Sequence, residues 1–158
     1  MFIRYDKISP RYLTGLSAEM SLNDDGTFEL FSRFMRLLMS VVKEVNFPVY
    51  DLRIFHGSQP VMPDTKYVKW AAVETNKLPE VPDKMQNLIL IEGEYAVFLH
   101  KGTAANAGVT FHYIFNKWLP EAAVKIDNRP HFDILLPGYK PNDPMAEHEI
   151  WIPIIRKT

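Results

Sequence analysis

Apolar residues first recur at helical spacing after a turn-forming run of Asn, Asp and Gly at residues 23–26. Six of them follow at steps of three or four residues, which places them on one side of a helix of about five turns: Phe31, Phe34, Met35, Leu38, Val42 and Val45. Pro48 cannot continue a helix, because it lacks a backbone donor and its ring clashes with the preceding turn. The pattern therefore predicts an amphipathic helix over residues 28–45.

A second helix is predicted at residues 103–123. Its apolar stripe contains Phe111, Ile114, Phe115, Trp118 and Ala122. Pro120 is unfavourable inside a helix, which places the predicted end near Leu119. Strands are predicted where apolar and polar residues alternate or where β-branched and aromatic residues are frequent. These segments are 11–20, 49–56, 66–75, 131–136 and 147–155, with one or two more strands at 86–102.

These elements occur in the order β-α-β-β twice. Residues 48–54 resemble residues 130–136, 82 positions later, and Phe28 matches Phe111 at 83 positions. Several matches in the same order at a nearly constant offset indicate an internal duplication, with units at 1–75 and 86–158 and a proline-rich linker at 76–84. The predicted fold class is α+β: one domain (1–158) in which duplicated β-α-β-β units form an antiparallel sheet with two main helices, pseudo-twofold symmetry and a central ligand groove.

Composition and charge narrow the function classes. The chain has 158 residues, 47% of them hydrophobic, and a formal net charge of −1, so it lacks the basic excess of a general nucleic-acid-binding surface. With no cysteine, it has no disulfides, thiolate metal sites or cysteine nucleophile. Its histidines lack metal-ligand spacing and the common nucleotide-binding motifs are missing, so we expect no metal and no cofactor. Neither a membrane span nor a signal peptide is predicted, which favours a cytoplasmic location.

Candidate chemistry lies on the last two predicted strands. One face of each is apolar and is expected to pack on the helices: Phe132, Ile134 and Leu136 on the first, and Ile150, Ile152 and Ile154 on the second. The opposite faces carry His131 and Asp133 on the first strand, and Glu149 and Trp151 on the second. If the strands pair, these four residues share one surface.

That surface has two interpretations. It is either a solvated sheet face or a pocket with an acidic floor and an aromatic wall, which would suit a flat, cationic or electron-poor ligand. In the second case, Trp70 and Tyr95 are expected to add to the wall. Trp118 belongs to the helical stripe and is interpreted as a core residue that can also line such a groove.

Motifs in the C-terminal half resemble the GyrI-like family, which includes the effector-binding domains of AraC-type and MerR-type regulators. The resemblance lies in residues 95–102 (YAVFLHKG), in Trp118-Leu119-Pro120 and in residues 129–133 (RPHFD). It continues in residues 149–154 (EIWIPI) and, more weakly, in residues 13–17 (LTGLS).

The resemblance implies a ligand groove between two β-α-β-β units, with aromatic walls and a carboxylate at its base. Asp133 occupies that carboxylate position, where the family usually has glutamate. It also implies a stand-alone member without a DNA-binding helix-turn-helix, so no direct DNA binding is expected.

Three functions remain open. The first is binding of a hydrophobic, cationic or aromatic small molecule, as a sensor or sequestering protein. The second is hydrolysis of strained electrophilic compounds, with Asp133 or Glu149 as general acid or base. The third is inhibition of DNA gyrase as a protein partner.

Overall fold

The computed structural model describes residues 1–57 and 62–157, and its main feature is a nine-stranded sheet. The strand order is β1-β6-β9-β8-β3-β4-β2-β5, and β7 pairs with β9. The described pairings are antiparallel. The strands are β1 (Phe2–Ile8), β2 (Arg11–Met20), β3 (Val49–Phe55), β4 (Tyr67–Glu74), β5 (Gln86–Leu90), β6 (Gly93–Lys101), β7 (Val124–Ile126), β8 (His131–Leu135) and β9 (Glu147–Arg156). The predicted α+β class with an antiparallel sheet and two main helices is confirmed.

The first helix, α1 (Thr27–Leu38), is shorter than its apolar stripe predicts. After its end, the Ser40 hydroxyl donates a hydrogen bond to the Leu37 carbonyl, an alternative to the backbone bonds of a continuing helix. Val42 and Val45 still pack against the same apolar cluster as the helix. Their spacing therefore reflects burial rather than helical structure.

The second helical segment is built from several short pieces. It begins with α2 (Ala107–Tyr113), continues through a π-helical turn at Ile114–Trp118 and ends with α3 (Leu119–Glu121). Pro120 lies in the first turn of α3, where a missing backbone N–H costs little. The helical segment thus extends past the predicted end at Leu119.

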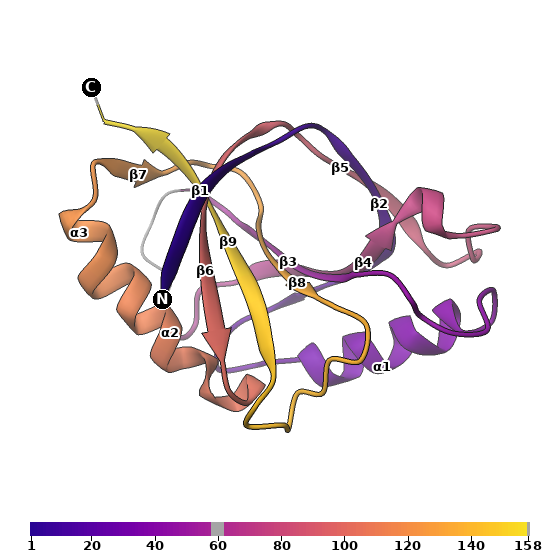
Figure 1. Cartoon of the computed structure of the whole chain (residues 1–158). Coiled ribbons are helices and arrows are strands. Elements are labelled where there is room, and N and C mark those ends of the chain that lie inside the picture. The colour runs from indigo at the N-terminus through magenta and orange to yellow at the C-terminus, as the bar shows by residue number, and fades with distance from the viewer. Residues whose placement is uncertain (58–61, 158) are drawn as a thin grey trace.

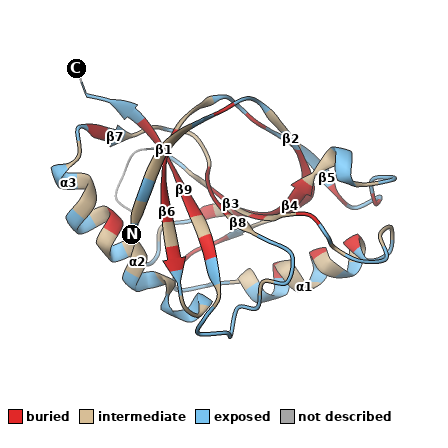
Figure 2. Cartoon of the chain, viewed as in Figure 1, coloured by how far each residue is buried: buried red, intermediate tan, exposed pale blue. Residues whose placement is uncertain are grey.

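Both helical segments lie on one side of the sheet, and the sheet curls away from them where β1 leads into β2 and β5 leads into β6 (Figure 1). On the helix side, α1 packs on β2 and β4 through residues that include Leu30, Phe34 and Leu16. Ile114 packs with Phe98 of β6 and with buried isoleucines of β9. Buried residues are concentrated in the strands (Figure 2). The side away from the helices, called the concave face below, has its own buried cluster.

The strand order is symmetric about the centre of the sheet, because equivalent strands of the two sequence halves occupy equivalent positions on either side. Strands β3 and β8 pair at the centre, β4, β2 and β5 follow on one side, and β9, β6 and β1 follow on the other. The two sequence halves exchange their outermost strands, because β1 pairs with β6 and β5 pairs with β2. Superposition of residues 1–75 on 86–158 is the measurement that tests the predicted duplication.

Gly15 of β2 lies where β2 and β4 approach closely. A Cβ atom at this position would collide with the Ala71 carbonyl oxygen and lie 2.7 Å from the Ala72 Cα. We expect Gly15→Ala to lower the free energy of unfolding by about 1–3 kcal/mol, because backbone atoms must move. The matched change Gly108→Ala meets open space in α2 and should raise stability by about 0.5–1 kcal/mol. Equal denaturation midpoints for the two variants would contradict this prediction.

Candidate functional site

The register of β8 and β9 decides which predicted site residues share a face. Phe132 lies opposite Trp151, and Asp133 lies opposite Ile150. Directly paired residues of neighbouring strands project to the same side of a sheet. Trp151 therefore lies on the concave face with Phe132, whereas Asp133 lies on the helix side with Ile150. The expectation that Asp133, Glu149 and Trp151 share one surface is wrong.

The reason for this error lies in the burial of β8 on both of its faces. His131, Phe132 and Asp133 are all buried, so that neither face is open to solvent. When both faces of a strand are covered, apolar alternation no longer shows which face meets the helices. Asp133 is tolerated on the helix side because charged neighbours compensate it there.

Four aromatic rings form the centre of the concave face, and they are called the aromatic cluster below: Tyr50, Tyr95, Phe132 and Trp151. Phe132 and Trp151 are stacked, with ring centroids 5.3 Å apart and an interplanar angle of 16°. Tyr95 meets Phe132 edge-on at 5.1 Å and Trp151 at 5.9 Å, and Tyr50 lies 5.6 Å from Phe132. Trp70 is buried in the same apolar core. The predicted wall residues Trp70, Tyr95 and Trp151 are thus close together, but as buried core residues that line neither of the two cavities described below.

Glu149 lies on the concave face in a fixed set of contacts. Its carboxylate accepts two hydrogen bonds from the Arg4 guanidinium, at 2.9 and 3.3 Å, and one from the Trp151 indole N–H at 3.1 Å. The hydrogen bond to Glu149 raises the pKa of Arg4. The same guanidinium lies 5.4 Å from the Trp151 ring centroid. The negative charge of Glu149 is therefore already paired with a positive charge.

A second guanidinium, that of Arg11, lies over the aromatic cluster. It is 5.6 Å from the ring centroid of Trp151 and 6.0 Å from those of Tyr50 and Phe132. Arg11 Nη1 donates a 2.8 Å hydrogen bond to the Tyr50 hydroxyl, which in turn donates to Glu74 at 3.2 Å. Burial raises the pKa of Tyr50 to about 12, so its hydroxyl keeps the proton that it donates.

A small cavity opens beside Arg11. Its volume is about 200 Å³, and it is lined by Pro10, Arg11, Tyr12, Glu74 and Asn76. Both charged groups of its lining thus belong to the hydrogen-bonded chain that runs through Tyr50. A molecule in this cavity would therefore meet the Arg11 guanidinium and the Glu74 carboxylate, whereas none of the four rings of the aromatic cluster lines it.

Asp133 belongs to a buried ionic network on the helix side of the sheet. The Arg53 guanidinium donates to Asp133 at 2.8 Å and to Asp51 at 3.3 Å, and Lys69 donates to Asp51 at 3.3 Å. Burial alone would raise the pKa of Asp133, but Arg53 and His148 outweigh it and hold this pKa at about 2. Asp133 is therefore an ionised member of a salt-bridge network that joins β8 to β3.

Two histidines border this network. His148 Nε2 lies 3.2 Å from the Asp133 carboxylate. His131, directly opposite Arg53 in the sheet, is buried, and its ring lies 4.9 Å from that of Phe55. Burial, assisted by Arg53, lowers the pKa of His131 to about 3, so the side chain is neutral near pH 7. The structure thus places His131 with Asp133 and apart from the aromatic cluster.

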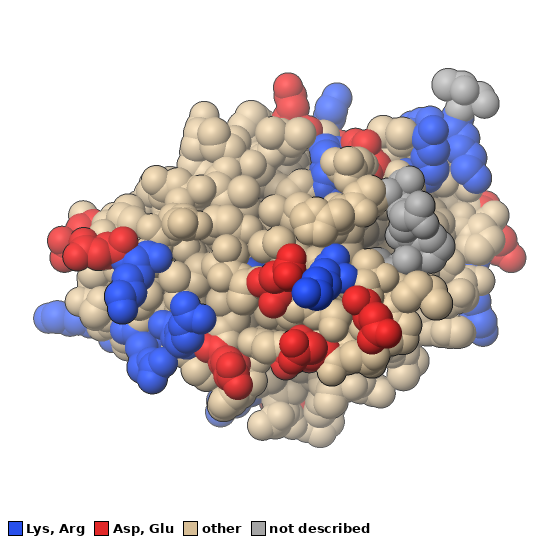
Figure 3. All heavy atoms as spheres, turned by 180° about the vertical axis from the view of Figure 1, so that it is seen from behind, with Lys and Arg blue, Asp and Glu red and all other residues tan. Residues whose placement is uncertain are grey.

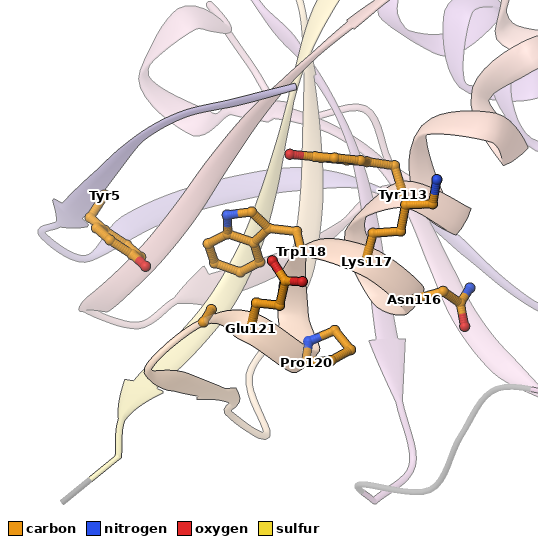
Figure 4. Close-up of a pocket in the computed structure, with 8 residues that line it drawn as sticks. Tyr5, Tyr113, Asn116, Lys117, Trp118, Pro120 and Glu121 are labelled. Atoms are coloured by element: carbon orange, nitrogen blue, oxygen red, sulfur yellow. The ribbon is translucent and has the colours of Figure 1, made fainter.

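Trp118 also lies on the helix side. Its ring stacks on Phe2 at 5.1 Å and meets Phe98 edge-on at 4.9 Å. A cavity of about 580 Å³ lies next to it, between β1 and the π-helical turn with α3 (Figure 4). Tyr5, Tyr113 and Glu121 also line this cavity. Trp118 is therefore separated from Trp151 by the sheet.

The surface charge agrees with the small net charge of the chain. On the face shown in Figure 3, acidic and basic side chains are interspersed. Among the described residues, no group of three or more His, Cys, Asp or Glu could hold a metal ion. In the same part of the chain, no helix combines the length and apolarity needed to cross a membrane.

The model of the GyrI-like small molecule binding domain matches residues 1–155, almost the entire chain. The chain belongs to this family. The resemblance seen in the C-terminal motifs is therefore confirmed, together with the relationship to effector-binding domains. No functionally curated protein matches the chain by sequence.

Solved structures share the GyrI-like fold at low sequence identity. SAV2435, bound to tetraphenylphosphonium, has a TM-score of 0.71 and 15% identity, with 98% of this chain and 94% of that chain covered. The integron cassette protein VCH_CASS2 of Vibrio cholerae has a TM-score of 0.69 at 15% identity, covering 96% and 95%. The C-terminal domain of EcmrR has a TM-score of 0.69 at 11% identity, covering 99% of both chains.

Four residues of the concave face of this GyrI-like domain were missed as site candidates: Arg4, Arg11, Tyr50 and Phe132. The alternation of β3 already placed Tyr50 on one face with Leu52, and both belong to the concave core. Arg11 is two residues from buried Leu13 on β2 and so shares its side of the strand. Arg4 has no comparable local signal, because its role depends on the pairing of β1 with β6.

Proposed function

We propose that this GyrI-like domain binds a hydrophobic, aromatic small molecule on its concave face. The observation that carries the proposal is the aromatic cluster, in which Phe132 and Trp151 stack in the buried core on the side of the sheet away from the helices. Because these rings are 0% and 3% exposed, a ligand reaches them when this core opens. Aromatic rings next to a few placed polar groups are typical of small-molecule sites. Arg11, Glu149 and the Tyr50 hydroxyl supply those polar groups here.

The positions of the carboxylates favour binding over hydrolysis. Glu149 is held by Arg4 and the Trp151 N–H, and Asp133 is held by Arg53 on the opposite face. A general base needs an acceptor oxygen within reach of the reacting water or substrate. With both carboxylates committed to charged partners, a binding role as a sensor or sequestering protein is the function that we propose.

The proposal is tested with the neutral fluorescent probe N-phenyl-1-naphthylamine. We expect saturable binding that weakens about tenfold in Trp151→Leu. The variant loses the ring–ring contact with the probe, which contributes roughly 1 kcal/mol of binding free energy in addition to the burial of apolar surface. The matched control is Trp118→Leu, on the other side of the sheet, which should bind like the unmodified protein. Circular dichroism checks that both variants fold.

The comparison of the two tryptophan variants also shows which result would contradict a site on the concave face. Loss of probe binding in Trp118→Leu with unchanged binding in Trp151→Leu would place the site in the 580 Å³ cavity between β1 and α3. Absence of saturable binding would contradict the proposed function itself.

A further inference from the structure

The aromatic cluster is closed to solvent in this structure. Tyr95 and Phe132 are fully covered, Trp151 is 3% exposed, and none of these rings lines either of the two cavities described above. Two guanidiniums lie over the Trp151 ring, with Arg4 at 5.4 Å and Arg11 at 5.6 Å from its centroid. Movement of one of these covering groups would expose the ring.

The two guanidiniums belong to strands that are held differently. Arg11 lies on β2, which pairs with both β4 and β5. Arg4 lies on β1, an edge strand that pairs with β6 alone within residues 1–57 and 62–157. The register of β1 shifts between Phe2 and Arg4, and Ile3 between them is 40% exposed. An edge strand with an irregular ladder opens at lower cost than a strand that is paired on both sides.

The Arg4 side chain ties this edge strand to β9, the strand beyond β6. Its two terminal nitrogens donate to Glu149 at 2.9 and 3.3 Å, and Glu149 also accepts the Trp151 indole N–H at 3.1 Å. Arg4 Nε donates to Asp6 of its own strand, a contact that moves with β1. The Arg4 and Glu149 side chains are 41% and 31% exposed, so solvent reaches the pair while the ring beneath it stays buried.

We propose that the edge strand β1 is a gate over the aromatic cluster and that the Arg4–Glu149 salt bridge is the latch that keeps it closed. When the salt bridge opens, the guanidinium leaves the Trp151 ring, and the indole N–H and the Glu149 carboxylate become accessible with it. The role of this gate in ligand entry rests on the proposed function, whereas the opening is a property of the unliganded protein. The apparent affinity for a ligand that binds only the open form is reduced by the open fraction.

Hydrogen exchange of the Trp151 indole N–H measures the opening without a ligand. Its NMR signal is assigned with Trp151→Leu, which lacks this N–H. We expect Arg4→Met to speed the exchange roughly tenfold, because it removes a guanidinium–carboxylate pair and a cation–π contact. The backbone N–H groups of β3 and β8, at the centre of the sheet, should keep their rates, because a local opening leaves them paired. Arg36→Met, at an exposed position of α1, is the matched control and should change none of these rates.

Salt supplies a second measurement that needs no substitution. Added NaCl screens charges that solvent reaches. Indole exchange of Trp151 should therefore speed up severalfold with NaCl in the unmodified protein and stay constant in Arg4→Met. If Arg4→Met does not fold, the salt dependence of the unmodified protein decides, and its absence would overturn the latch.

The neutral probe N-phenyl-1-naphthylamine tests whether the gate controls ligand entry. In stopped-flow mixing, we expect Arg4→Met to take up the probe about tenfold faster than the unmodified protein and to bind it more tightly, because a larger fraction is open. Replacement of a residue that merely supports the site would weaken binding. The direction of the change therefore distinguishes a gate from a structural contact.

The possible outcomes separate the gate from the proposed function. Unchanged indole exchange in Arg4→Met, equal acceleration of the backbone N–H groups of β3 and β8, or weaker probe binding in this variant would overturn the gate. Each of these results leaves the proposed function standing as long as the probe binds. Faster indole exchange in a protein that binds no probe would instead overturn the proposed function, and β1 would remain an edge strand that opens without a role in ligand entry.

Discussion

Replacement of Arg53 by Met is expected to lower the free energy of unfolding by about 3–5 kcal/mol, the usual cost of removing one partner from a buried salt bridge. Arg53 is buried and donates to Asp133 at 2.8 Å and to Asp51 at 3.3 Å. These two aspartates are directly opposite each other on β8 and β3. Without the guanidinium, two neighbouring carboxylates would remain, with the Lys69 ammonium next to Asp51 and the His148 ring next to Asp133.

Chemical denaturation of Arg53→Met and of the unmodified protein measures this effect. Arg156→Met removes the exposed partner of Glu94 and should change stability little, because surface salt bridges are screened by solvent. Adding Asp133→Asn to Arg53→Met should recover part of the lost stability, since it removes one uncompensated carboxylate. If the double variant is no more stable than Arg53→Met alone, repulsion between the uncompensated carboxylates of Asp51 and Asp133 is not the cause of the lost stability.

Acidification from pH 7 to pH 4 is expected to lower the free energy of unfolding by about 3 kcal/mol through His131 alone. Burial, assisted by Arg53, lowers the pKa of His131 from 6.5 to about 3 in the folded protein. Between these values, the unfolded chain binds a proton that the folded chain does not. Stability is therefore fully present above pH 6.5 and is lost as the pH falls toward 3.

Denaturation at a series of pH values tests this dependence. His131→Gln should flatten the change between pH 7 and pH 4, because the variant has no titrating group at this position. The exposed His56 provides the control, and His56→Gln should keep the full acid dependence. A steep, unchanged dependence in His131→Gln would show that other groups, such as Asp133, cause the acid sensitivity.

The sequence alone predicts much of the fold, because local periodicity carries the information. The stripe that includes Leu38 marks α1, the alternation of Tyr50 and Leu52 marks β3, and the C-terminal motifs indicate the family. Trp70, Tyr95 and Trp151 were also expected to lie together, and they do so in the concave core. These features depend on residues that are close in sequence or on residue types that favour burial.

Tertiary structure alone decides which face each site residue occupies. Asp133 lies on the helix side because β8 is buried on both faces, where alternation cannot distinguish one side from the other. Arg11 and Tyr50 are 39 positions apart, and Arg4 and Glu149 are 145 apart, so their contacts arise only from the sheet order. The predicted acidic floor is consequently replaced by a carboxylate paired with Arg4 and a guanidinium over aromatic rings. Strand pairing sets this electrostatic character, and no local pattern encodes it.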